Sequence, residues 1–129
     1  SYLKFLLILY GYMDLKFYKE TKEKFLMSNL KRENINVSEI DDLLGNIELI
    51  DIREPYECKS GMLKTAINIP MQDLLDAPDE FLDKNKEYYL ICRSGARTAS
   101  TCYMLREEGY NVINVAGGII SYEGDNIER

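Results

Sequence analysis

The sequence predicts an α/β domain with a mostly parallel, five-stranded sheet, helices on both faces and an N-terminal helical extension. From residue 35 onward, short apolar runs typical of buried strands alternate with segments typical of helices. Such alternation joins parallel strands through crossover helices, which then cover the sheet. With 129 residues, of which 46% are hydrophobic and 29% charged, the chain is long enough for one domain with its own core.

The first 33 residues differ in pattern and are assigned to a separate amphipathic extension, which leaves 34–129 as the α/β domain. Apolar side chains recur there at helical spacing, namely Leu3, Leu6, Leu7, Tyr10, Met13 and Phe17. The apolar run is far shorter than the ~20 residues that span a bilayer. No small-residue cleavage site of a secretory signal follows it. We expect this helix to pack on its own domain, with a homodimer contact or a membrane surface as alternatives.

Within the α/β domain, each element is predicted from its local pattern. The expected strands are 35–37, 47–52, 66–69, 88–91 and 112–115. Ser38 is expected to cap a helix that Gly45 ends, because serine favours the first and glycine the last position of a helix. The expected helices are 39–44, a turn over 55–58, two pieces within 71–82 broken at Pro78, 96–108 closed by Gly109, and a short turn after 117–118.

Charge and composition exclude several classes of function. Lys and Arg number 16 against 22 Asp and Glu, so the net charge is −6, and we expect neither nucleic acid nor a membrane as a partner. The chain has no His, and its three cysteines lie far apart, so no metal site, cofactor or disulfide framework is expected. Free thiols indicate a reducing, cytoplasmic compartment. Without histidine, any cysteine chemistry requires a thiolate that other groups stabilise.

The strongest chemical signal is Cys92, which directly follows the predicted strand 88–91 and precedes a helix. The small residues that follow it let the backbone curl and point its N–H groups at one centre, as in an anion-binding nest. The helix N-terminus adds positive potential, and Arg93 and Arg97 add two charges. Such surroundings bring a cysteine pKa from ~8.5 to ~3.5–7.5. We therefore predict Cys92 as a nucleophile, rather than the unreactive core thiol that buried cysteines often are.

These residues also resemble a known family. Residues 92–98, Cys-Arg-Ser-Gly-Ala-Arg-Thr, are similar to the active-site loop of single-domain rhodaneses. Three further segments, 49–57, 61–70 and 115–119, resemble the family's other signatures in the same order. The resemblance covers about residues 34–125 and implies a rhodanese fold. Met62 stands where the family usually has His, and Thr65 where it usually has Gly.

The resemblance implies a sulfurtransferase that carries sulfane sulfur from a small anionic donor such as thiosulfate to a thiol or cyanide. The Cys92 thiolate would take the outer sulfur as a persulfide, and the acceptor, a small or a protein thiol, would then remove it. Substrate-binding roles are implied for Arg93, Ser94, Gly95, Ala96, Arg97 and Thr98, although Arg97 could instead clamp the loop. The alternative is a sulfur-carrier or protein-interaction module with little turnover on small acceptors.

The spacing within the loop and the residues near it allow further interpretations. Cysteine phosphatases of this fold separate Cys and Arg by five residues, whereas Cys92 and Arg97 are separated by four, which favours a single sulfur over a phosphoryl group. Asp51 and Arg53 could support the loop, but a structural ion-pair or hydrogen-bond network that includes Glu54 and Glu57 is the favoured interpretation. Cys102 is expected in the core and Cys58 half-buried, with redox roles as the alternative.

Overall fold

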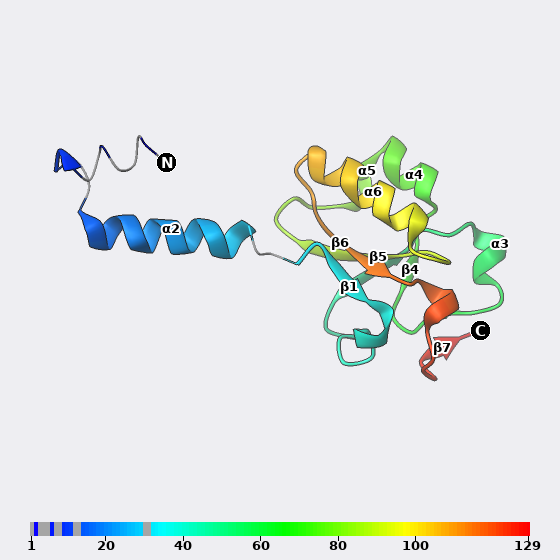
Figure 1. Cartoon of the computed structure of the whole chain (residues 1–129). Coiled ribbons are helices and arrows are strands. Elements are labelled where there is room, and N and C mark those ends of the chain that lie inside the picture. Colours follow the sequence, from blue (N-terminus) through cyan, green and yellow to red (C-terminus); the bar gives the residue numbers. More distant parts are fainter. Residues whose placement is uncertain (1, 3–5, 7–8, 12–13, 30–31) are drawn as a thin grey trace. The chain divides into compact units, whose positions relative to one another are not determined.

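The computed structural model describes residues 2, 6, 9–11, 14–29 and 32–129, with only the backbone over 24–29. The chain divides into two compact units, Ser1–Arg32 and Glu33–Arg129, which are considered separately (Figure 1). In the described part, no helix combines the length and the apolar character that crossing a membrane requires.

In the first unit, helix α2 spans Leu15–Asn29 (Figure 1). The Asp14 carboxylate begins it by accepting the backbone N–H groups of Lys16 and Phe17 at 2.7 and 3.1 Å. The prediction of one helix between residues 3 and 17 is wrong, because Gly11 adopts φ +77° in a turn. Of the residues on which that prediction rested, Leu3, Leu7 and Met13 lie outside the described part, and Phe17 belongs to α2.

The second unit contains a five-stranded sheet in the order β1-β6-β5-β2-β4, and every neighbouring pair is parallel. The predicted fold class is thus confirmed. The strands are β1 Asn34–Asn36, β2 Glu48–Asp51, β4 Ile67–Asn68, β5 Glu87–Ile91 and β6 Asn111–Ala116. A second, antiparallel pair that the sequence pattern did not predict joins β3 Met62–Leu63 to β7 Ile127–Glu128.

Thr65 lies between β3 and β4 and adopts φ +71°, the left-handed region that favours glycine. This is the position at which the rhodanese signature usually has glycine. The departure therefore changes the residue but keeps the backbone conformation.

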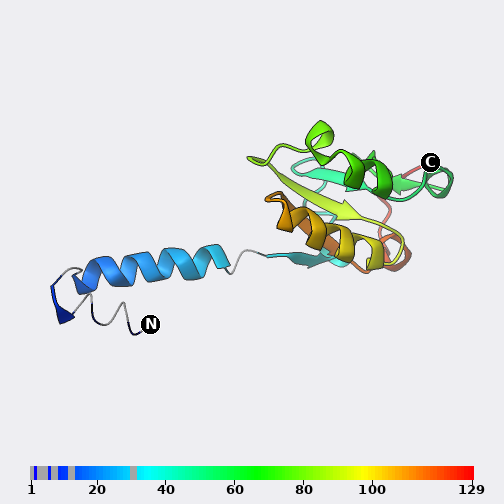
Figure 2. The same ribbon diagram turned by 90° about the horizontal axis from the view of Figure 1, so that it is seen from above.

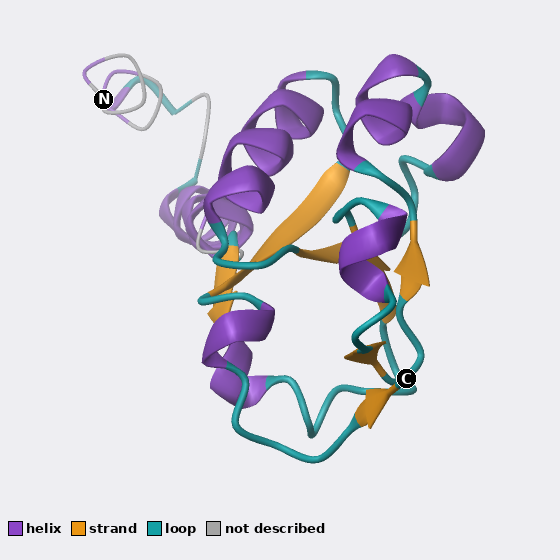
Figure 3. Cartoon of the chain, turned by 90° about the vertical axis from the view of Figure 1, so that its right-hand side faces the viewer, coloured by secondary structure: helices purple, strands orange, loops and turns teal. Residues whose placement is uncertain are grey.

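Two layers of different make-up cover the faces of the sheet. One face carries α4 Met71–Asp76, α5 Pro78–Phe81 and α6 Ala96–Glu107, which lie over the strands in Figures 1 and 2. The other face carries short 3₁₀ turns, η1 Val37–Glu39 and η2 Ile119–Ser121, and the small β3-β7 sheet (Figure 3). Successive residues of one strand enter opposite cores, as Leu90 and Ile91 of β5 do.

The helix predicted over 39–44 is replaced by the shorter η1. Its N-cap is Asn36 rather than Ser38, because the Asn36 side chain accepts the Ser38 N–H at 2.9 Å. The Glu39 carboxylate completes a capping box by accepting the Asn36 N–H at 2.9 Å. The capping box shifts the start of the helix by two residues, and only turns follow before Gly45, at φ +87°.

Candidate active site

Cys92 lies at the carboxyl edge of the sheet, directly after the central strand β5 and four residues before the first residue of α6. Parallel strands all end at this edge, so the ends of β2 and β6 flank it. Gly95 turns the chain into α6 with φ +95°. A Cβ on Gly95 would lie only 3.1 Å from the backbone nitrogen of Gly117, which explains the need for glycine here.

The loop surrounds the Cys92 sulfur with hydrogen-bond donors. The Gly95 N–H donates to Sγ at 3.1 Å, and the Thr98 hydroxyl lies 3.6 Å from it. The Cys92 side chain is fully buried. Burial raises the pKa of the thiol, but hydrogen bonds from the Thr98 hydroxyl and from the backbone of Thr98, Gly95 and Ser94 oppose it, and the pKa is lowered overall. Uncharged donors thus stabilise the thiolate.

The Arg97 guanidinium is bound by the carboxylate of Glu57. Glu57 belongs to helix α3, which spans Pro55–Cys58. The two terminal nitrogens of Arg97 donate to the two carboxylate oxygens of Glu57 at 2.8 and 2.7 Å, a bidentate pair. The hydrogen bonds from Arg97 lower the pKa of Glu57 to about 2. Of the two roles considered for Arg97, this geometry matches the clamp, which ties α3 to the first turn of α6.

Asp51 and Arg53 form a buried ion pair at the end of β2. The Arg53 Nε lies 3.0 Å from both carboxylate oxygens of Asp51, and Nη2 lies 2.8 Å from one of them. Nη2 also donates to the Gly61 carbonyl at 2.8 Å, and Nη1 to the Glu57 carbonyl at 3.3 Å. The guanidinium therefore braces segment 57–61, as the structural interpretation expected, and is connected to the loop through Glu57, which binds Arg97.

Arg93 projects from the loop and is exposed. Within the described residues, its guanidinium has no ion-pair or hydrogen-bond partner. It borders a pocket of about 270 Å³, whose lining residues are Arg53, Glu57, Ser60, Arg93, Ile119 and Ile120. Cys92 is not among these lining residues, so the pocket borders the loop at Arg93, where a small anion can meet a positive charge.

Of three supporting residues, Glu57 and Gly118 lie in segments that the sequence analysis had singled out, whereas Asn114 was not predicted. Asn114 is buried in β6, where its Oδ1 accepts the Thr98 hydroxyl at 2.5 Å and its Nδ2 donates to Asn34 Oδ1 at 3.1 Å. A polar residue inside the apolar run 112–115 was the available signal.

Gly118 is required because the chain after β6 crosses the loop at close range. The N–H groups of Ile119 and Ile120 donate to the carbonyls of Cys92 and Arg93, both at 2.9 Å. A Cβ on Gly118 would lie 2.3 Å from the Arg93 carbonyl oxygen. The resemblance to the family's closing Gly-Gly turn pointed to this place, but the contact itself is tertiary.

The other two cysteines differ from Cys92. Cys102 is fully buried in α6, and burial raises its pKa to about 12. Cys58 is half-buried, and burial is also the main reason that its pKa is raised. The predicted burial of both residues is confirmed, and neither thiol is activated in the way that Cys92 is.

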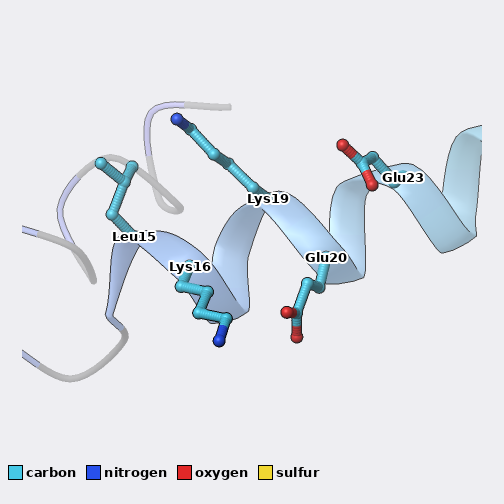
Figure 4. Close-up of a pocket in the computed structure, with 5 residues that line it drawn as sticks. All are labelled: Leu15, Lys16, Lys19, Glu20 and Glu23. Carbon is cyan, nitrogen blue, oxygen red and sulfur yellow. The ribbon is translucent and has the colours of Figure 1, made fainter.

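A second pocket, of about 420 Å³, lies on α2 and contrasts with the loop (Figure 4). Its lining residues are Leu15, Lys16, Lys19, Glu20 and Glu23. In Figure 4, Leu15 and Lys19 point to one side of the helix, whereas Lys16 and Glu20 point to the other. Because these polar groups do not converge, the cysteine loop is the better candidate for chemistry.

Comparisons with known proteins agree with this fold. The sequence matches the rhodanese-like domain family over residues 36–125. It is 46% identical over 77 residues to a Bacillus subtilis protein named "Putative sulfurtransferase YtwF", covering 60% of this chain and 74% of that protein. A protein of Allochromatium vinosum named "Sulfurtransferase" is 37% identical over 78 residues, covering 60% of this chain and 72% of that protein.

A solved structure gives the same result for the fold. The crystal structure of SSP1007 from Staphylococcus saprophyticus superimposes with a TM-score of 0.69 at 30% identity, covering 75% of this chain and 99% of that one. The family match spans well over half of the chain. The chain therefore belongs to the rhodanese-like domain family, and the relatives to which it is similar include proteins named as sulfurtransferases.

Proposed function

We propose that this chain carries sulfane sulfur from a thiosulfate-type donor to a thiol or cyanide acceptor through a persulfide on Cys92. The supporting observation is the ring of hydrogen-bond donors from Ser94, Gly95 and Thr98 around a sulfur whose pKa is lowered despite burial. A chain without histidine needs such a ring, since the imidazole that usually activates a cysteine thiol is absent.

In the first step, the Cys92 thiolate attacks the outer sulfur of thiosulfate. A new sulfur–sulfur bond forms, the bond of the donor breaks, and its electron pair leaves with sulfite. The negative charge then lies on the outer sulfur of the persulfide, where the loop N–H groups stabilise it as they stabilise the thiolate. Arg93 at the pocket supplies a positive charge for the incoming anion.

In the second step, an acceptor thiolate or cyanide attacks the outer sulfur of the persulfide. Cys92 leaves as a thiolate, and the donors that stabilised the first thiolate now stabilise the leaving group. Because the Cys92 side chain is fully buried in this structure, side chains at the pocket must move aside to admit each substrate. The bound group thereafter is shielded from water.

The test is intact mass after incubation with thiosulfate. The wild-type chain is expected to gain about 32 Da, the mass of one sulfur, and Cys92→Ser to gain none. Cys58→Ser is the matched control, because it removes a half-buried thiol outside the loop, and it should gain as the wild type does. A gain followed by turnover with cyanide supports the enzyme, whereas a gain without turnover supports the sulfur carrier. Failure to gain mass would contradict both.

A further inference from the structure

Three arginines lie at or next to the pocket, and two of them already hold a carboxylate. Arg53 and Arg93 line the pocket, whereas Arg97 is connected to it through Glu57, which also lines it. Arg53 is paired with Asp51 at 2.8 Å, with both side chains almost fully buried. Arg97 is paired with Glu57 at 2.7 Å, with side-chain exposures of 34% and 17%. Together with Arg93, these groups leave a single net positive charge beside the loop.

We propose that Glu57 is a specificity-determining residue whose carboxylate occupies Arg97 in place of a substrate anion. The site would then favour sulfur donors with one negative charge, such as an organic persulfide, over sulfonate-bearing dianions such as thiosulfate. This inference rests on the proposed persulfide on Cys92 and refines its donor: thiosulfate remains a substrate, but a weaker one than an organic persulfide.

The carboxylate of Glu57 is well placed for this role. One of its oxygens also accepts the Glu54 N–H at 2.8 Å, so the first turn of α3 orients it toward Arg97. Its pKa of about 2 keeps it charged throughout the neutral range. A bidentate, half-buried pair of this kind is stronger than an exposed ion pair. A dianion must therefore displace Glu57 or bind with Arg93 as its only unpaired guanidinium among the described residues at the pocket.

The two donor classes load the same atom but release different groups. Thiosulfate gives Cys92 its outer sulfur and releases sulfite, which takes the electron pair of the broken bond and two negative charges. An organic persulfide gives its outer sulfur and releases a thiolate with one negative charge. Arg97 freed from Glu57 would stabilise the bound dianion and the departing sulfite more than it would the monoanionic donor.

The experiment measures kcat/KM for loading from thiosulfate and from a small alkyl persulfide, each with cyanide as acceptor. Glu57→Gln is expected to raise kcat/KM for thiosulfate about three- to tenfold through a lower KM, with less than a twofold change for the alkyl persulfide. The thiosulfate gain should shrink at high salt, since screening weakens the freed charge. Glu107→Gln is the control, because it removes the same charge from the exposed, opposite end of α6.

A variant of Arg97 tests whether the thiosulfate gain in Glu57→Gln acts through the Arg97 guanidinium. In the double variant Glu57→Gln/Arg97→Gln, the gain with thiosulfate should disappear, because no freed guanidinium remains. Glu57→Asp, whose shorter side chain draws the carboxylate back from Arg97, should show a smaller gain and replaces Glu57→Gln if that variant does not fold. An unchanged or lower preference for thiosulfate in a folded variant would overturn the inference. Absence of persulfide from the wild type with either donor would instead overturn the proposed function.

Discussion

The Thr98 hydroxyl has one proton and three acceptors within reach. The Cys92 sulfur lies 3.6 Å away, the Gly95 carbonyl 3.1 Å and the Asn114 Oδ1 2.5 Å. When Cys92 is a neutral thiol, the proton can remain with Asn114. When Cys92 ionises, the same proton can turn to the sulfur and stabilise the negative charge. This residue therefore couples the ionisation of the thiol to the buried polar network of β6.

Replacement of Thr98 by valine removes that proton while keeping the branched shape. We expect the pKa of Cys92 to rise by about one unit, since a hydrogen bond to a charged group contributes about 1.5 kcal/mol. The rate at which iodoacetamide alkylates Cys92 is measured by mass spectrometry between pH 5 and pH 10. A higher pKa of Cys92 appears as a slower reaction at neutral pH. Ser100→Ala is the control, because it removes another hydroxyl of α6 that donates to the Arg97 carbonyl. If the pH midpoint of Cys92 alkylation is the same in both variants, the role of Thr98 is contradicted.

At the scale of elements, the loop depends on the turn that follows β6. Gly118 combines φ +62° with ψ −168°, a conformation open essentially to glycine alone. It brings η2 against the carbonyls of the loop, so that the ends of β5 and β6 are joined by backbone hydrogen bonds. The shape of the nest around Cys92 is thus set partly by residues that lie more than twenty positions further along the chain.

Gly118→Ala is expected to destabilise the fold by about 2–4 kcal/mol, because its Cβ would meet a backbone oxygen that cannot move freely. Gly45→Ala is the matched control. Gly45 also has a positive φ, +87°, but a Cβ there would meet nothing within 4 Å, so we expect a loss of only about 1 kcal/mol. Urea unfolding gives both values. Equal losses would show that the close approach at the loop costs nothing.

At the scale of the whole molecule, the pair of Glu57 and Arg97 links segments 40 residues apart in the sequence. The pKa of Glu57 is about 2 in the folded chain, below its ordinary value of 4.5. A lowered pKa means that the unfolded chain binds the proton more readily. The stability that the pair contributes is therefore present above about pH 4.5 and is lost as the pH falls toward about 2.

The urea midpoint, measured between pH 7 and pH 3, tests this linkage. The wild type should lose more stability over that interval than Glu57→Gln, because glutamine has no carboxyl to protonate. Glu107→Gln, an exposed change on α6, should retain the acid sensitivity of the wild type. If Glu57→Gln is as sensitive to acid as the wild type, the pair does not contribute to the stability of the fold.

Local patterns predicted much of this molecule, and the failures have physical causes. Strands β2, β5 and β6 were placed to within one or two residues, because their residues are mostly apolar and β-favouring. The helix over 39–44 was wrong because a capping box centred on Asn36 competes with Ser38. The small sheet of β3 and β7 was missed because each strand has only two residues, and their pairing joins distant segments.

By itself, the sequence determined the parallel α/β architecture and predicted Cys92 as the nucleophile of the loop 92–98, since each depends on residues close together in the chain. Hydrophobic periodicity and a run of small residues between a strand and a helix involve residues only a few positions apart. Such local patterns can be recognised in the sequence. Only the tertiary structure decided how the arginines are used. Arg97 is bound by Glu57 from another element, and Thr98 by Asn114, because folding alone brings these opposite charges and polar groups together.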